Sequence, residues 1–166
     1  MKNTKFQTIT GIGILTALYV ALAFACKIPL IGHLSTDLGY IAFAVALMFF
    51  GWKGAFVGVA GCFIETFILQ GWIPYGWIVG QLFIGLVCGL IYTKTDKKVI
   101  HYIVTVASVF IGVGLIKTSI ECALFDLPFI VKLAKNSLAF VADTIPMLLG
   151  LTVSYKLRNR VKIKGV

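Results

Sequence analysis

Long apolar segments constrain the fold of this chain more than any other feature of its sequence. Of its 166 residues, 60% are hydrophobic and 13% are charged, and the mean hydropathy is +1.00. A soluble domain of this size carries about 25% charged residues. The composition therefore indicates a lipid bilayer as the solvent, and the length leaves room for one membrane domain.

Hydropathy predicts an all-α membrane protein in which residues 1–166 form a single integral membrane domain with six transmembrane helices. The predicted spans lie near residues 8–26, 38–50, 54–70, 76–93, 100–124 and 134–156. The span at 38–50 is short, since a bilayer core usually needs about 20 helical residues, so it must tilt or include part of the preceding loop. Pro29, Pro74 and Pro128 fall in three connections on one side of the membrane.

The distribution of lysine and arginine predicts the orientation of the chain. With the N-terminus inside, the basic residues of both tails and of the loops at 51–54 and 93–98 are cytoplasmic, whereas Lys27, Lys132 and Lys135 are external. The positive-inside rule therefore places both termini in the cytoplasm and the proline-bearing loops outside. The net charge of +9 does not indicate a nucleic-acid partner, because the basic residues form no face with interleaved aromatic side chains.

Ionisable residues inside the apolar segments point to a working site. Glu65, Lys117, Glu121 and Asp143 each lie within a predicted span, where a charge costs roughly 3 kcal/mol unless it meets a partner, a cavity or a ligand. The predicted topology places them, together with Gln81, in the outer half or the middle of the membrane. Further candidates for substrate binding lie in or near the external loops, namely Trp72, Tyr75, Trp77 and Asn136. A pocket that opens outward is therefore expected.

Purely structural roles stay open for these residues. Lys117 and Glu121 are four residues apart and could neutralise each other on one helix face. The aromatic residues at 72–77 could form an interfacial belt, and Gln81 could join two helices by a hydrogen bond. The other two carboxylates have no partner nearby in the sequence.

Neither cysteine nor histidine spacing indicates a metal site or a disulfide framework. The cysteines are far apart and form no CxxC motif; they are Cys26, Cys62, Cys88 and Cys122. We interpret them as small buried hydrophobic residues. His33 and His101 fall in predicted loops, where we expect them to be solvated.

Small residues recur every fourth position along the first span, at Gly13, Ala17, Ala21 and Ala25. This spacing lines one helical stripe and allows another helix backbone to approach closely. The neighbouring helix could belong to this chain or to another membrane protein.

The order of several short motifs resembles a known family. The segments Asp37–Tyr40, Phe50–Gly58, Gly71–Pro74 and Gly85–Gly89 are similar to the riboflavin-type branch of the substrate-binding S components of energy-coupling factor (ECF) vitamin transporters. The predicted span number, the cytoplasmic termini and the alanine stripe agree with this resemblance. It covers essentially the whole chain.

The resemblance implies a multi-pass protein of the bacterial cell membrane that binds a micronutrient beneath its external loops. It implies a partnership with a membrane scaffold subunit and two cytoplasmic ATPases, and it places scaffold docking at Ala17, Ala21 and Ala25. The ligand shell would come from residues 33–40, 65–81, 117–128 and 136–143, which adds Asp37 and Tyr40 to the candidates. No Walker A motif occurs, so ATP would be used by the partners, and no cofactor and no enzymatic activity are expected.

The substrate itself is less constrained. An acidic residue often follows Asp-Leu-Gly in the riboflavin-type branch, and Tyr40 stands there in this chain, so riboflavin is not assigned. Three intramembrane carboxylates against one lysine favour a cationic or N–H-rich nitrogen heterocycle, such as a 7-deazaguanine or queuosine precursor, a pterin, or a thiamine-like or pyridoxamine-like vitamin, over an anion such as pantothenate or niacin.

Two other classes of function stay open. A membrane-embedded hydrolase is disfavoured because neither GxSxG nor HExxH occurs. A stand-alone secondary carrier or channel for a small solute remains the alternative, although the sequence shows no convincing internal repeat.

Overall fold

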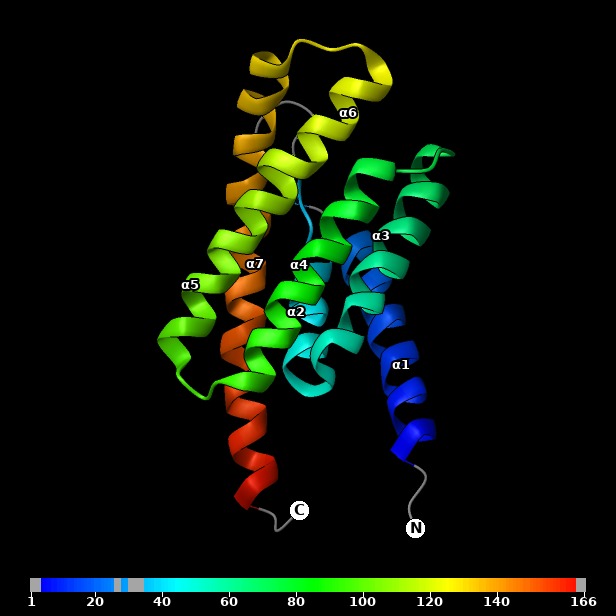
Figure 1. Ribbon diagram of the computed structural model, residues 1–166. Helices are drawn as coiled ribbons and strands as arrows, with labels where there is room; N and C mark the ends of the chain where they lie inside the picture. Colours follow the sequence, from blue (N-terminus) through cyan, green and yellow to red (C-terminus); the bar gives the residue numbers. More distant parts are fainter. Residues whose placement is uncertain (1–3, 26–27, 30–34, 164–166) are drawn as a thin grey trace.

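The chain folds into a bundle of helices whose axes run roughly along one direction (Figure 1). The computed structural model describes residues 4–25, 28–29 and 35–163. Its elements are α1 (Thr4–Ala25), β1 (Ile28–Pro29), β2 (Ser35–Thr36), α2 (Gly39–Phe50), the 3-10 turn η1 (Gly51–Gly54), α3 (Ala55–Gln70), α4 (Tyr75–Lys94), α5 (Lys98–Val109), the π-helical segment η2 (Phe110–Lys117), α6 (Thr118–Phe125) and α7 (Phe129–Ile163).

The predicted all-α architecture holds with one small addition. β1 and β2 pair antiparallel, with Ile28 opposite Thr36. Strands of two residues leave no alternating pattern in the sequence, so hydropathy did not predict them.

Five helical stretches in the described residues are long and apolar enough to cross a membrane, judged by length and composition. Apart from residues 38 and 70, the predicted spans at 38–50 and 54–70 fall within one of these, Gly39–Leu69. The chain reverses inside that stretch, because Gly51 has a φ of 58°, which glycine tolerates and other residues rarely adopt. In Figure 1, α2 runs toward the end that carries both termini and α3 runs back. α2 has 12 residues and rises only about 18 Å.

The last helix begins earlier than hydropathy predicts. The predicted span started at residue 134, whereas α7 starts at Phe129. The boundary is set by Asp126, which ends α6 in the left-handed conformation with φ of 51°, and by Pro128, which is suited to the start of a helix. Lys132 and Lys135, predicted to be external, are therefore on the first turns of α7.

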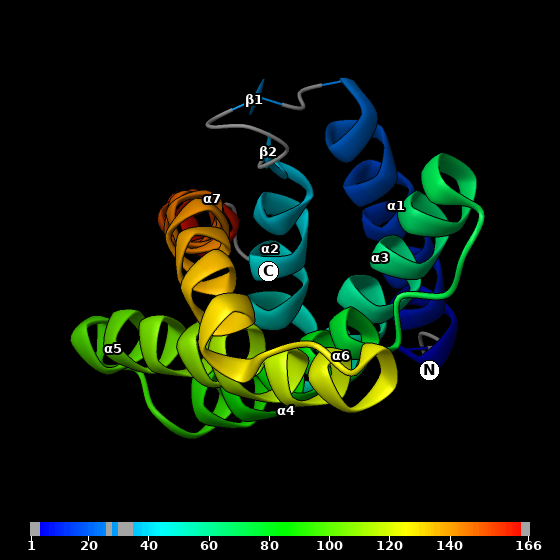
Figure 2. The same ribbon diagram turned by 90° about the horizontal axis from the view of Figure 1, so that it is seen from above.

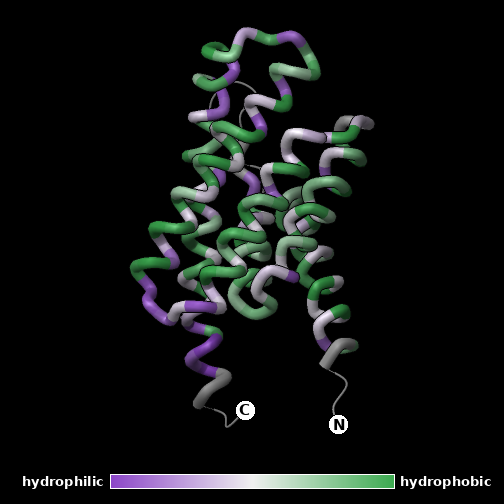
Figure 3. The backbone as a smooth tube through the Cα atoms, viewed as in Figure 1, coloured by the Kyte–Doolittle hydropathy of each residue, from purple (hydrophilic) through white to green (hydrophobic). Residues whose placement is uncertain are grey.

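α2 lies near the middle of the bundle. It packs extensively against α7 and α1, while α3 packs against α4, and the view along the bundle shows α2 between α7 and α1 (Figure 2). The buried core gathers around Tyr40, Phe43, Leu47, Met147 and Leu151. Hydrophilic residues concentrate near the end with the termini and again near the α6–α7 connection (Figure 3).

A close glycine contact positions η2 against α4. A methyl group on Gly80 would lie 2.8 Å from the carbonyl oxygen of Gly112, which is too close for any other residue without movement of the backbone. The pair brings η2 against the first half of α4, where Lys117 lies beside Gly76. Helices that lack side chains at the contact approach closely in this way.

Candidate functional site

A cavity of about 580 Å³ lies between the helices, within the size range of small-molecule sites. Trp72 and Phe125 meet edge to face, with ring centroids 6.2 Å apart, and both belong to its wall. These residues lie next to the α3–α4 and α6–α7 connections, at the end of the bundle opposite the termini (Figure 1). The lining consists of Tyr19, Asp37, Tyr40, Cys62, Glu65, Thr66, Trp72, Trp77, Gln81, Lys117, Glu121, Phe125, Lys132, Lys135, Asn136, Ala139 and Asp143.

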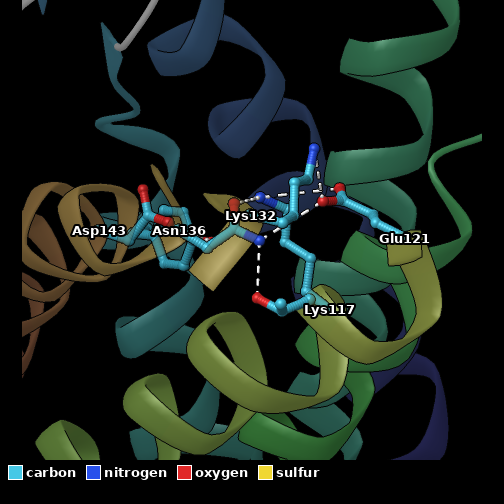
Figure 4. A network of polar contacts seen from close by, with 7 residues as sticks. Lys117, Glu121, Lys132, Asn136 and Asp143 are labelled. Carbon is cyan, nitrogen blue, oxygen red and sulfur yellow. Dashed lines mark hydrogen bonds and ion pairs between the residues drawn. The ribbon is translucent and has the colours of Figure 1, made fainter. Parts of the chain in front are cut away.

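One wall carries a network of ion pairs and hydrogen bonds. Glu121 accepts from Lys132 at 3.0 Å and lies 3.8 Å from the Lys117 ammonium. Lys117 also donates to the Asn136 side-chain oxygen at 2.8 Å, and the Asn136 amide donates to the Thr118 hydroxyl at 2.8 Å. Figure 4 shows this network with Asp143 beyond Asn136. The polar groups are thus held in fixed positions along the wall.

An aromatic ring completes the environment of Lys117. Its ammonium lies 3.8 Å from the centroid of the Trp77 ring, a distance at which the negative ring face attracts a cation. Trp77 and Gln81 are four residues apart on α4 and therefore face the same side. Lys117 is consequently fixed by a carboxylate, an amide and an indole.

The opposite wall is acidic and rich in tyrosine hydroxyls. Tyr19 donates to Asp37 at 2.9 Å, and the Gly39 amide donates to the other Asp37 oxygen at 2.7 Å. Tyr40 donates to Asp143 at 3.3 Å. Burial, together with the nearby Glu65 carboxylate, raises the pKa of Asp37 to about 7.

Gln81 leaves one atom without a partner. Its side-chain nitrogen donates to the Tyr40 hydroxyl at 2.5 Å, and the residue is 1% exposed. Its side-chain oxygen is the one buried side-chain N or O atom in the described part of the chain that makes no hydrogen bond. Because an unpaired buried acceptor is costly, a donor from a bound molecule is expected there.

The structure brings together every residue proposed from the sequence for substrate binding, except one. All of them line the cavity apart from Tyr75, which is 54% exposed. Lys117 and Glu121 form the ion pair that the structural alternative expects. Both also line the cavity, so the pair does not have a structural role alone. Trp77 contacts the Lys117 ammonium and lines the cavity, whereas a residue of an interfacial belt would only face the lipid headgroups.

Seven lining residues were not singled out from the sequence. Thr66, Phe125 and Ala139 fall in the ranges that the resemblance implied for the ligand shell, whereas Tyr19, Cys62, Lys132 and Lys135 lie outside those ranges. Helical spacing could have found most of them. Residues four apart share a helix face, so Lys132 follows from Asn136, Phe125 from Glu121, and Cys62 from its neighbours at 65–66. Tyr19 carries no such signal, because its contact with Asp37 joins separate elements.

The expectation for His101 is wrong. This residue is 0% exposed in α5. Its Nε2 lies 2.7 Å from the Thr95 carbonyl oxygen, to which it must donate, and its Nδ1 bonds to the Tyr155 hydroxyl at 2.5 Å. Hydropathy misplaced it because a histidine near a helix start resembles a loop residue when its partners are distant in sequence. His33 lies outside the described residues.

The small-residue stripe of α1 faces away from the bundle. Gly13, Ala17, Ala21 and Ala25 are all exposed, and only 11% of the most apolar window of α1 is buried within the chain. The alternative that the stripe packs against a neighbouring helix of this chain is therefore disfavoured.

Fold and site together define a helical membrane protein with a polar cavity of small-molecule size. The chain belongs to the family described as ECF-type riboflavin transporter, S component, whose family model matches residues 3–157. A solved structure of the S component for biotin from an ECF-type ABC transporter has a similar fold, with a TM-score of 0.69 over 96% of this chain and 94% of that one. The two sequences are 19% identical, so this comparison shows a shared fold alone.

Curated relatives share part of the sequence. A UPF0397 protein of Streptococcus thermophilus (strain LMD-9) is 33% identical over 97 residues, which are 58% of this chain and 54% of that protein. A UPF0397 protein of Phytoplasma australiense is 32% identical over 111 residues, which are 61% of this chain and 57% of that protein. The chain spans about half the length of the curated relatives it matches.

Proposed function

We propose that this chain is the high-affinity substrate-binding subunit of an ECF-type importer, and that it captures a vitamin or related nitrogen heterocycle from outside the cell. The observation that carries the proposal is the cavity of about 580 Å³ lined by buried ionisable residues. Such residues are rare inside membrane proteins and usually mark a substrate path. Family membership supports the same role.

The proposed topology has six passes, with both termini in the cytoplasm of a bacterial cell. α2 and α3 then count as separate passes, and the reversal at Gly51 supports this count. The basic segments near Lys94, Lys98 and Arg158 lie at the same end as the termini (Figures 1 and 3), as the positive-inside rule requires for a cytoplasmic face. The cavity would then lie near the outer face.

The proposed partners are a membrane scaffold subunit and two cytoplasmic ATPases. The α1 stripe supports a scaffold contact there, because it is exposed and Gly13 has no atom within 4 Å of where a methyl group would lie. Close helix approach across small residues provides van der Waals contact within lipid.

Reconstitution tests this proposal. Small molecules released from the purified chain are identified by mass spectrometry, and uptake of the identified compound is measured in proteoliposomes with and without the scaffold and ATPases. ATP-dependent uptake that needs the complete assembly is expected. Uptake by the chain alone would favour a secondary carrier, and failure to recover or bind any small molecule would contradict a substrate-binding role.

Substitution of Ala21 by tryptophan separates docking from binding. A bulky side chain blocks close helix approach, so Ala21→Trp should abolish ATP-dependent uptake while affinity for the substrate stays within about twofold, since Ala21 lies outside the cavity. Leu149→Trp, on the exposed face of α7, is the matched control and should retain uptake. A parallel loss of affinity and uptake in Ala21→Trp would show that the stripe is structural.

A further inference from the structure

The charges around the cavity are separated along α7. Lys132 and Lys135 lie on its first turns and Asp143 lies deeper. Eleven positions separate Lys132 from Asp143, or about 16 Å along the axis at 1.5 Å per residue. Asn136 lies between these two groups in Figure 4. The cavity therefore has a basic pole and an acidic pole rather than a uniform charge.

The basic pole carries more positive charge than its own side chains neutralise. Lys117, Lys132 and Lys135 all line it. Glu121 pairs with the first two, and it is the single carboxylate within ion-pair distance of any of the three among the described residues. Lys135 is exposed. One carboxylate facing three ammonium groups leaves an excess of positive charge for an anion to neutralise.

The acidic pole has the opposite character. Asp143, 3% exposed, and Asp37 line it, and the Glu65 carboxylate adds to the local negative field. The unpaired oxygen of Gln81 belongs to the same wall and joins Asp143 through the Tyr40 hydroxyl. Acceptors gather here, and at least one buried acceptor lacks a donor.

The prediction of a generally acidic pocket, made from the intramembrane residues alone, does not describe this arrangement. It counted Lys117 as the one cation, because Lys132 and Lys135 were assigned to the outside of the membrane. Their position on α7 and in the cavity wall removes the argument against an anionic group on the substrate.

Building on the proposed function, we propose that the substrate is bipolar. It carries a cationic or N–H-rich group that enters first and meets Asp143 and the Gln81 oxygen, and an anionic group, carboxylate or phosphate, that stays near Lys132 and Lys135. Charge-assisted hydrogen bonds at both ends would fix its orientation in the cavity.

Three probes that share one ring test the proposal by calorimetry on the full chain in detergent. Pyridoxamine lacks the phosphate, pyridoxine 5′-phosphate lacks the side-chain amine, and pyridoxamine 5′-phosphate has both, while the ring and its charges are common to all three. The probe with both groups should bind at least about 10-fold more tightly than either other, since a hydrogen bond to a charged group contributes 1.5–3 kcal/mol. In Lys135→Gln, pyridoxamine 5′-phosphate should no longer bind more tightly than pyridoxamine. In Asp143→Asn, it should no longer bind more tightly than pyridoxine 5′-phosphate. Lys156→Gln, on the exposed surface of α7, is the control.

The outcomes separate this proposal from the proposed function. Equal binding of pyridoxamine and its phosphate would overturn the bipolar class, as would recovery from the purified chain of a molecule with only one kind of charged end. Recovery of a molecule with both ends would support it even if the probes bind weakly. Absence of any recovered molecule and of all probe binding would contradict the substrate-binding role itself.

Discussion

Two buried polar clusters lie in different halves of the bundle, and they differ in one respect. The His101 cluster consists of Tyr92, His101, Thr105 and Tyr155 near the termini. Both ring nitrogens of His101 are bonded, and the hydroxyls of Tyr92 and Thr105 bond to each other. The cavity cluster, which consists of the lining residues given above, surrounds a hollow and leaves the Gln81 oxygen unpaired.

The comparison shows what distinguishes a site from a polar core. Burial of polar residues is common to both clusters, so burial alone does not mark function. A satisfied network stabilises and fixes a packing arrangement, whereas an unpaired acceptor beside a cavity has capacity for a ligand. Changes in the cavity cluster should therefore alter affinity, and changes in the His101 cluster should alter stability.

The largest effect is expected from Asp143→Asn. Loss of the charged acceptor should weaken binding of pyridoxamine 5′-phosphate, or of the molecule recovered from the purified chain, by about 10- to 100-fold. Calorimetry provides the measurement. Thr152→Val, at a hydroxyl near the other cluster, should leave affinity unchanged. Equal affinity of Asp143→Asn and the unaltered chain would place the substrate elsewhere.

His101→Phe should have the converse effect. It leaves the Thr95 carbonyl and the Tyr155 hydroxyl without their partner, and each lost bond of this kind costs about 1–3 kcal/mol. We expect a lower thermal unfolding midpoint in detergent with unchanged substrate affinity. If affinity fell while the midpoint held, the two clusters would not be functionally distinct.

A smaller effect is expected for Gln81→Met. The substitution removes the acceptor proposed for the substrate, so affinity should fall by about 3- to 10-fold, corresponding to a hydrogen bond worth 0.5–1.5 kcal/mol. Stability should fall only by the bond that the Gln81 nitrogen donates to Tyr40, about 0.5–1.5 kcal/mol, because the acceptor is already unpaired without ligand. Tyr92→Phe, which breaks a satisfied contact, is the comparison and should lower the unfolding midpoint without changing affinity.

The last prediction concerns the pH dependence of stability. The folded-state pKa of Asp37 is raised from 3.8 to about 7, so the folded chain binds a proton that the unfolded chain releases near pH 4. The stability associated with that proton is present below about pH 4 and is lost as pH rises through about 7. Asp37→Asn should therefore flatten the fall of the unfolding midpoint between pH 5 and pH 8. An identical slope in both proteins would assign it to another group.

Sequence patterns predicted the helices better than their contacts. The apolar spans gave the positions of α1 and α4 to within a few residues, because lipid imposes length and hydropathy directly. The start of α7 was wrong because hydropathy does not detect a polar helix that extends beyond the apolar region. The intramembrane charged residues correctly indicated the cavity wall, since a charged side chain in a bilayer is costly unless it faces a partner, a cavity or a ligand.

Other features depend on tertiary contacts that no local pattern records. Tyr19 meets Asp37 across separate elements, and the partners of His101 are distant in sequence. The polarity of the cavity was missed because Lys132 and Lys135 were assigned to the outside, and their place in the cavity wall depends on the fold. A residue type and its spacing predict a helix face, but the element opposite that face is known only from the fold.

The π-helical segment has a consequence for variation of this chain. Each residue of a regular α-helix advances the side-chain direction by about 100°, and a π-helical turn contains an additional residue relative to an α-helical one. Deletion of a single residue between Phe110 and Lys117 should thus remove the additional residue and restore ordinary winding, so that the side chains after it keep nearly the same directions. Related chains that are one residue shorter here and have ordinary α-helical winding would therefore be expected to present the same wall residues to the solute.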